Sequence, residues 1–149
     1  SNNCTISYGQ QIAEAKSDIC DGRFNTTGCL AQASSPYTYG TGANYIGGGV
    51  YAMEWTSNHI KIWFFSPSRT PVDIIFGIPM PNTWSRPQVY FKGSDTCNID
   101  EHFRNHNIVF DTTFCGDWAG SKFGSDPVCA NKGSCAEWVA QNPIAFRNV

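Results

Sequence analysis

Two runs of alternating side chains around a short polar turn are the clearest pattern in the chain. The alternation extends from Val50 to Thr56 and returns from Ile60 to Phe65. A period of two is typical of a β-strand whose two faces meet different surroundings. The turn between the two runs, at residues 56–59, is polar. The pattern therefore predicts an antiparallel hairpin over residues 50–65.

A second strand is predicted over residues 103–114, where β-branched and aromatic residues lead into a Gly-Asp-Trp-Ala-Gly turn at 116–120. A tryptophan held between two glycines at a strand end does not easily bury both faces of its ring. An exposed indole beside a carboxylate is typical of a sugar subsite, because the ring packs on the C–H face of a pyranose and the acid binds its hydroxyls. Trp118 and Asp117 are therefore candidate substrate-binding residues. The alternative is a core tryptophan beside a loop.

Weaker patterns cover the remaining residues. Residues 4–45 are rich in Gly, Ser, Thr and Asn, which predicts long loops with at most short strands and one helix-compatible run at residues 11–16. Residues 67–87 hold five prolines, so regular strand pairing is not expected there beyond residues 72–76. Such a segment can form the wall of a cleft. Trp84, which lies in it, either lines that wall as a substrate-binding residue or holds the loop in place.

The last predicted element is a short helix. Residues 134–140 have helical periodicity, and Ser134 is placed to cap the helix with Glu137 three residues further on. The Asn142-Pro143 pair ends it, because a residue before proline is disfavoured in the helical region.

The composition limits the class of protein. A length of 149 residues suits one domain, or part of one, with a sizeable core. The net charge is −2 with 15% charged residues and no basic run, so nucleic-acid binding has no support. The longest apolar stretch, at residues 60–65, is too short to cross a bilayer. Five tryptophans within an aromatic content of 14% suit a carbohydrate binder and also suit a β-sandwich core.

Seven cysteines indicate disulfides and an oxidising compartment, and hence a secreted protein. Two N-glycosylation sequons, at Asn3 and Asn25, agree with secretion. The start of the chain has no signal-peptide pattern, so we interpret it as a mature chain or a fragment. No metal or cofactor is expected, because there is no Cys-x-x-Cys pair and the three histidines are scattered.

The pairing of the cysteines stays open in the sequence, because one thiol is left over after three bridges. The nearest local pair is Cys129 with Cys135, and Cys4 with Cys20 or Cys29 is plausible. This choice leaves Cys97 and Cys115 as the harder cases.

No pair of acids in this chain forms a convincing catalytic site. Glycoside hydrolysis normally needs two carboxyl groups, about 5–5.5 Å apart in a retaining enzyme. Asp111 and Asp117 flank the end of the predicted second strand but lie too far apart along an extended chain, so Asp111 is kept only as a candidate for substrate binding. Asp100 and Glu101 are adjacent and would point to opposite faces of a strand. A Gly-x-Ser-x-Gly elbow is also absent from the sequence, and the three histidines, His59, His102 and His106, suit loops or strand ends better than catalytic bases.

Several long segments resemble the fungal laminarinase-like branch of glycoside hydrolase family 16. The resemblance covers most of the chain, in the same order, and rests on residues 47–56, 60–65, 97–103 and 105–120. It implies an endo-β-1,3(4)-glucanase built as an all-β, antiparallel, jelly-roll (concanavalin-like) sandwich with long disulfide-tied loops. The catalytic strand of the family, Glu-x-Asp-x-x-Glu, lies upstream of the matched region. Neither that spacing nor the final strand of the family occurs in this sequence, so the resemblance implies an incomplete sandwich.

The resemblance also bears on Glu54, which sits among apolar residues of the predicted hairpin. It could be a catalytic acid with a raised pKa, or the partner of Lys61 across the hairpin. Because the corresponding Glu-Trp pair of the family is structural, we favour the pairing with Lys61. Related enzymes carry a further cysteine in the upstream half, which implies that one of the seven cysteines pairs outside this chain.

Three functions remain open. The chain is the downstream part of a secreted β-glucanase whose catalytic glutamates lie elsewhere, or a non-catalytic β-glucan-binding protein, or a secreted defence or immunomodulatory protein that acts by protein contact. A sandwich without its upstream strands would expose an apolar sheet face, made of Tyr51, Met53 and Trp55 or of Ile60, Ile62 and Phe64. We therefore expect a second chain or a second copy to cover that face.

Overall fold

The computed structural model describes residues 4–23, 28–109 and 114–146 and divides the chain into two compact units, residues 1–106 and 107–149. The first unit contains every strand of the described residues, and the second contains short helices. Asn3, Asn25 and Asp111, for which the sequence predicts glycosylation or substrate binding, lie outside the described residues.

The predicted hairpin is confirmed. Strand β4 covers Val50–Trp55 and strand β5 covers His59–Phe65, and the two pair antiparallel with Glu54 opposite Lys61. The turn between them is closed by the Thr56 hydroxyl oxygen, which accepts hydrogen bonds from the backbone N–H groups of Asn58 and His59 at 3.3 and 3.1 Å.

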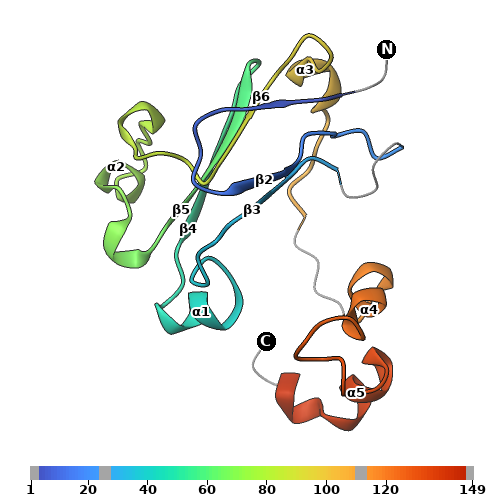
Figure 1. Ribbon diagram of the computed structural model, residues 1–149. Helices are drawn as coiled ribbons and strands as arrows, with labels where there is room; N and C mark the ends of the chain where they lie inside the picture. Colours follow the sequence, from blue (N-terminus) through green and yellow to red (C-terminus); the bar gives the residue numbers. More distant parts are fainter. Residues whose placement is uncertain (1–3, 24–27, 110–113, 147–149) are drawn as a thin grey trace. The chain divides into compact units, whose positions relative to one another are not determined.

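Strand β5 is one of the two inner strands of a four-stranded antiparallel sheet with the order β1-β6-β5-β4 (Figure 1). Strand β1 covers Ser7–Tyr8 and strand β6 covers Val89–Lys92. A separate two-stranded sheet joins β2, Glu14–Ser17, to β3, Leu30–Gln32. The helix-compatible run at 11–16 was therefore a wrong prediction, because part of it is extended in β2 and pairs with β3. Strand β6, which only tertiary pairing completes, was missed.

The two faces of the four-stranded sheet differ in chemistry. Residues directly opposite one another in an antiparallel pair share a face, so one face carries Tyr51, Met53 and Trp55 together with their partners across the hairpin: Phe64, Ile62 and Ile60. The opposite face carries Glu54, Lys61, Trp63 and Phe65. The two apolar sets that the sequence suggested as alternatives thus form a single face.

Each face buries some of its residues and exposes others. Trp63 and Phe65 are buried, and Ile60 is buried on the other face, whereas Tyr51 and Met53 remain 59% and 58% exposed. A second core, around Ile6, lies beside the Cys4–Cys97 disulfide, with Tyr8 and Phe91 packed against it. The sheet is therefore well packed at β5 and open along one side of β4.

Short helical turns occupy the connections of the first unit. They are α1 at Gly40–Tyr45, η1 at Pro67–Arg69, α2 at Val72–Ile75, η2 at Pro81–Thr83 and α3 at Ile99–His102. The segment at 72–76, the one part of the proline-rich stretch where pairing was considered, forms α2 instead of a strand. The side chain of Asn98 caps α3 by accepting a hydrogen bond from the backbone N–H of Glu101 at 3.2 Å.

The segment predicted as a strand and turn, residues 103–120, differs most from its prediction where the structure describes it. Residues 103–109 form no strand, and the predicted turn at 116–120 is the start of helix α4, Asp117–Phe123. A strand needs a hydrogen-bonded neighbour, and no described residue pairs with 103–109. The C-terminal helix is confirmed as α5, Cys135–Gln141, with the predicted Ser134 cap, and η3 follows at Pro143–Phe146.

The disulfides correct the predicted pairing. They join Cys4 to Cys97, Cys20 to Cys29 and Cys115 to Cys135, and Cys129 is free. The nearest cysteine in sequence was the wrong partner for Cys135, which instead bonds Cys115 just before α4, where α5 packs near α4. Proximity in sequence also failed for Cys4, whose partner lies 93 residues away.

Candidate functional site

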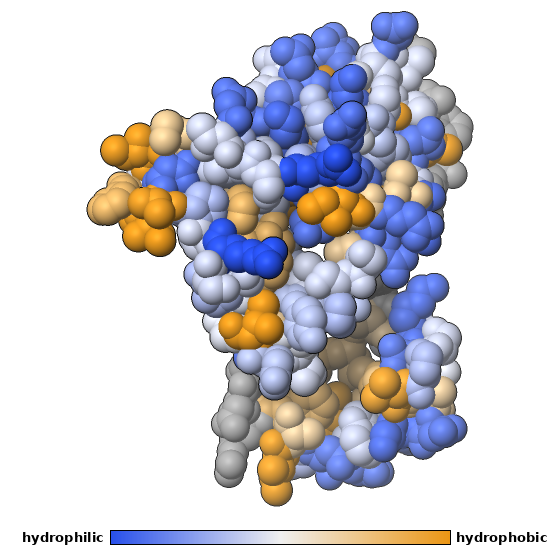
Figure 2. All heavy atoms as spheres, turned by 60° about the vertical axis from the view of Figure 1, so that its left-hand side comes forward, coloured by the Kyte–Doolittle hydropathy of each residue, from blue (hydrophilic) through white to orange (hydrophobic). Residues whose placement is uncertain are grey.

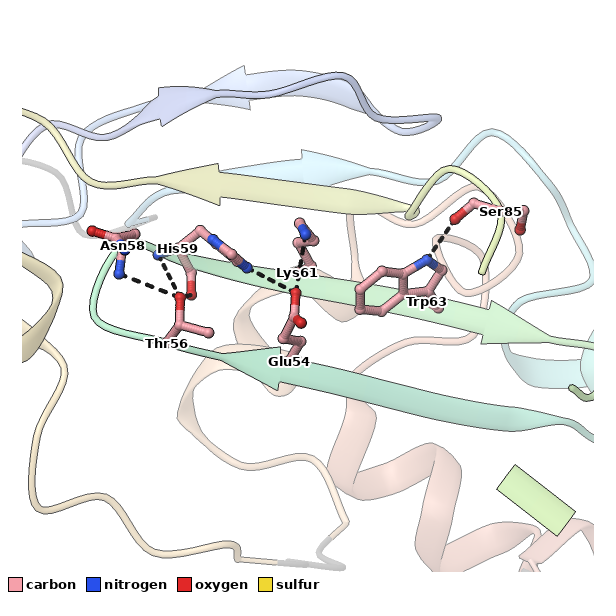
Figure 3. A network of polar contacts seen from close by, with 7 residues as sticks. All are labelled: Glu54, Thr56, Asn58, His59, Lys61, Trp63 and Ser85. Atoms are coloured by element: carbon pink, nitrogen blue, oxygen red, sulfur yellow. Dashed lines mark hydrogen bonds and ion pairs between the residues drawn. The ribbon is translucent and has the colours of Figure 1, made fainter. Parts of the chain in front are cut away.

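The hairpin holds a compact polar network around Glu54 (Figure 3). The Glu54 carboxylate binds the His59 ring at 2.7 Å and accepts a hydrogen bond from the Lys61 ammonium at 3.0 Å. All three side chains are about four-fifths buried. The preferred interpretation of Glu54 as the partner of Lys61 is confirmed, and His59 joins the pair because it lies on the same face at the start of β5.

The electrostatics of Glu54 do not suit a general acid. Partial burial by itself raises the pKa of Glu54, but the hydrogen bonds from His59 and Lys61 and their charges outweigh it, so the pKa ends below its ordinary value of 4.5. A catalytic proton donor needs a raised pKa near the working pH. Glu54 is therefore a structural carboxylate.

Aromatic rings surround this network. The Lys61 ammonium lies 5.1 Å from the centre of the Tyr90 ring and 5.9 Å from that of Trp63. The Trp63 indole N–H donates to the backbone carbonyl of Ser85 at 2.8 Å, which ties β5 to the segment before β6 (Figure 3). Side-chain contacts thus link β4, β5, β6 and the segment before β6 on the face of the sheet that carries Glu54.

Trp84 is held by Asp73. Its indole N–H donates to the Asp73 carboxylate at 2.7 Å, and the same carboxylate accepts from the backbone N–H groups of Met80 and Ile74 at 2.6 and 2.9 Å. Burial raises the pKa of Asp73, but these three hydrogen bonds outweigh it and hold the pKa below its usual range. The carboxylate is therefore ionised at neutral pH and fixes the loop around it.

The Trp84 ring also packs edge-to-face against the core. Its centre lies 5.0 Å from that of Trp63 and 5.4 Å from that of Phe65. Trp84 thus holds its loop in place and also lines a crevice of about 800 Å³, and its role in substrate binding stays a prediction. Sequence reasoning missed Asp73, because its partner Trp84 lies eleven residues further along the chain and no local pattern joins the two.

Of the candidate substrate-binding residues in the second unit, the structure describes the side chain of Asp117 but not those of Trp118 and Asp111. Asp117 is exposed in the first turn of α4, where a negative charge suits the helix N-terminus. Gly116 precedes it with a φ of +62°, a conformation that favours glycine. Trp118 belongs to α4, but its side chain, like Asp111, lies outside the described residues. The structure therefore leaves the proposed pairing of Trp118 and Asp117 at a sugar as a prediction.

The remaining candidates form no further site in the described residues. Asp100 and Glu101 occupy the first turn of α3. The rings of Phe103 and His106 lie 6.4 Å apart beside a second, smaller crevice of about 380 Å³. Within the described ranges no group of three or more His, Cys, Asp or Glu side chains could hold a metal ion, and no helix there is long and apolar enough to span a membrane.

Comparison with known proteins decides the family. A family model described as "XgeA-like, catalytic GH16 domain" matches residues 1–149. The chain belongs to glycoside hydrolase family 16. The resemblance drawn from the hairpin and the 105–120 segment is thereby confirmed, and so is the antiparallel all-β fold class, since the solved members are jelly-roll sandwiches.

Curated relatives and solved structures agree. The chain is 40% identical over 129 residues to the endo-1,3(4)-beta-glucanase of Arthroderma benhamiae, a match that covers 85% of this chain and 28% of that protein. It is 36% identical over 158 residues to an endo-1,3(4)-beta-glucanase of Emericella nidulans, a match that covers 99% of this chain and 24% of that protein.

Among solved structures, laminarinase 16A of Phanerochaete chrysosporium, with two β-glucans in its donor and acceptor sites, superposes with a TM-score of 0.85 at 37% identity over 98% of this chain and 50% of that one. An elongating family 16 β-1,3-glucosyltransferase superposes with a TM-score of 0.76 at 42% identity over 84% of this chain and 42% of that one. The chain spans about a quarter of the length of the curated relatives and about half of the laminarinase.

Proposed function

We propose that this chain forms the glucan-binding downstream part of a β-1,3(4)-glucanase, with the catalytic carboxylates supplied by a segment outside these 149 residues. The observation that carries the proposal is the open apolar face of β4. Tyr51, Met53 and Trp55 are 40–59% exposed on a sheet that is otherwise packed. An exposed stripe of this kind costs free energy in water and is normally covered by the second layer of a sandwich.

The chemistry of the chain supports the same division. No Glu-x-Asp-x-x-Glu spacing occurs in the sequence. Glu54 and Asp73 are two described acids that lie near aromatic rings. Their carboxylate oxygens accept hydrogen bonds from neighbouring groups, and their pKa values are lowered. The relatives named as glucanases are about four times longer than the matched region. A pair of catalytic carboxylates on another segment would therefore explain the family membership without a catalytic site in these 149 residues.

The substrate part of the proposal is a β-glucan chain bound by Trp118 and Asp117, with Asp111 nearby in sequence. The Trp118 ring would stack on a pyranose and Asp117, exposed at the start of α4, would accept its hydroxyls. Three disulfides and the sequons at Asn3 and Asn25 support a secreted protein. The partner that covers β4 is an upstream segment, and a second copy of the chain is the alternative.

Complementation tests this proposal. The chain is produced alone and together with the segment of the Emericella nidulans relative that carries the Glu-x-Asp-x-x-Glu strand, and reducing-sugar release from laminarin is measured. We expect no release from the chain alone and hydrolysis from the pair. A matched pair in which the first Glu of that motif is replaced by Gln should be inactive. Failure of the two parts to associate would contradict the proposal.

The missing motif also favours a second candidate, a non-catalytic β-glucan-binding protein. Pull-down on insoluble laminarin with no sugar release under any complementation would select it. Intact-mass measurement on a native preparation separates the two directly, because a mass well above that of 149 residues plus glycans would reveal the catalytic part. Neither binding nor hydrolysis would select the third possibility, a protein that acts by protein contact.

A further inference from the structure

The crevice beside Trp84 is a feature that the catalytic proposal does not use. It has a volume of about 800 Å³, within the range of small-ligand sites. Four parts of the chain form its walls: Ile12 before β2, residues 35–46 around α1, the end of β5, and the proline-rich stretch from 66 to 88. All of its lining residues lie within the first unit.

The walls combine aromatic surface with separate polar groups. Phe64, Trp84 and the half-exposed Tyr37 supply rings, while Thr83 and Gln88 supply a hydroxyl and an amide. Sugars are bound by this combination, since rings cover the C–H faces of a pyranose and amides, hydroxyls and charged groups bind its hydroxyls.

The aromatic wall is fixed before any ligand arrives. The Asp73 carboxylate accepts hydrogen bonds from the indole N–H of Trp84 and from the backbone N–H of Met80. The Trp84 ring packs edge-to-face against Trp63 and Phe65. The Trp84 ring therefore contributes surface to the crevice and not a hydrogen-bond donor. A wall that is already ordered loses little conformational entropy on binding, which favours affinity.

The charges of the crevice select the class of ligand. Its lining holds one cation, Arg69, and one anion, Asp73. Among the described residues Arg69 makes no ion pair, and it is exposed at the end of η1, so its guanidinium is available to a ligand. Because the two charges cancel, the crevice as a whole attracts neither an anion nor a cation. A neutral polyhydroxyl ligand fits it best.

We infer that this crevice is a second binding site for a neutral gluco-oligosaccharide, separate from the Trp118 segment, in which Arg69 and Tyr37 bind the sugar and Trp84 forms the wall. The inference rests on the proposed function for its choice of glucan. Such a site would hold a polysaccharide chain near the enzyme and raise the effective concentration of its cleavable stretch.

The neighbouring surface of α2 does not compete with this interpretation. Val72, Ile75, Phe76 and Ile78 are each more than 60% exposed, and Figure 2 shows hydrophobic side chains gathered on a projection at the left-hand edge of the molecule. Apart from Val72, they lie outside the lining of the crevice. They therefore leave Arg69, which is exposed, accessible to a sugar.

Calorimetric titration of the full chain with laminarihexaose tests the inference. We expect Arg69→Ala and Tyr37→Ala each to weaken binding roughly tenfold, the loss expected when one good contact is removed. Both residues are exposed, so neither variant threatens folding. The matched controls are Arg104→Ala and Tyr45→Ala, which change exposed residues outside the lining. We expect the controls to bind as the parent chain does.

Three results would overturn the inference. The first is unchanged binding in both crevice variants together with loss in Trp118→Ala, which leaves the proposed function standing. The second is tighter binding of a uronic-acid or glucosamine oligomer than of laminarihexaose. The third is no binding of laminarihexaose by the parent chain, because every described lining residue belongs to this chain. The catalytic proposal would then still be judged by complementation.

Discussion

Residues 50–65 and residues 103–114 are the two strongest strand patterns in the sequence, yet the structure treats them differently. The first segment forms the β4–β5 hairpin with full antiparallel register. In the second, the described residues 103–109 form no strand. A hairpin carries its own hydrogen-bonding partner a few residues away, whereas a single strand depends on a partner from elsewhere. A strand-like sequence pattern shows that a segment can form a strand. Whether it does depends on a neighbouring strand with free backbone hydrogen-bonding groups.

The two units are also cross-linked on different scales. In the first unit the Cys4–Cys97 disulfide spans 93 residues, and in the second the Cys115–Cys135 disulfide spans 20. A long loop loses more entropy when it is closed in the unfolded chain than a short loop does. The unit that holds the sheet should therefore depend more on its long disulfide.

The largest expected effect comes from that disulfide. Replacing Cys4 and Cys97 by Ala should lower the free energy of unfolding of the first unit by about 4–5 kcal/mol, and replacing Cys115 and Cys135 should cost the second unit about 3 kcal/mol. Urea unfolding followed by amide hydrogen exchange resolves the two units. Equal losses in the two variants, or a loss in the wrong unit, would break the comparison.

A pair of tryptophans tests the two faces of the sheet. Trp63 is 3% exposed and Trp55 is 40% exposed on adjacent strands. Trp63→Ala should cost about 3–5 kcal/mol, since it leaves a cavity and unpairs the Ser85 carbonyl, whereas Trp55→Ala should cost below about 1 kcal/mol. Thermal or urea unfolding measures both. A large loss for Trp55→Ala in the chain alone would mean that β4 is covered by a second copy.

A smaller effect concerns acid stability. The pKa of Glu54 is lowered in the folded chain, so its contribution is complete above its ordinary value of 4.5 and is lost as the pH falls through the lowered pKa. Glu54→Gln should therefore cost about 1 kcal/mol at pH 7 and nearly nothing at pH 2. Unfolding curves at a series of pH values test this. Glu14→Gln in β2 is the control, because it removes only an exposed ion pair with Lys16 that contributes little to stability.

The smallest effect concerns the free thiol. Burial raises the pKa of Cys129 above its usual range, and the Asp126 carboxylate adds to the rise. The chain should therefore contain one slowly alkylated thiol at pH 8, and Asp126→Asn should speed its reaction. Mass spectrometry after timed iodoacetamide treatment counts and times the modification. If no thiol reacts in a native preparation even after unfolding, Cys129 is paired with a cysteine outside this chain.

Much of the hairpin region could be predicted because its information is local. The alternation, the polar turn and the Glu54–Lys61 pairing all lie within sixteen residues, and the Ser134 cap lies within four. The disulfide partners and the hold of Asp73 on Trp84 could not be predicted, because each joins residues that the sequence separates by a loop or by most of a unit.

The amino-acid sequence by itself determined the hairpin, the capped C-terminal helix, the disulfide-rich character and membership of a glucan-active family, since these rest on neighbouring residues and on long distinctive segments. Only the tertiary structure decided that two apolar sets share one face, that Cys4 meets Cys97, and that Arg69, Tyr37 and Trp84 line one crevice. Such contacts depend on strand register and chain reversal, and a one-residue change in register would move every side chain of a strand to the other face.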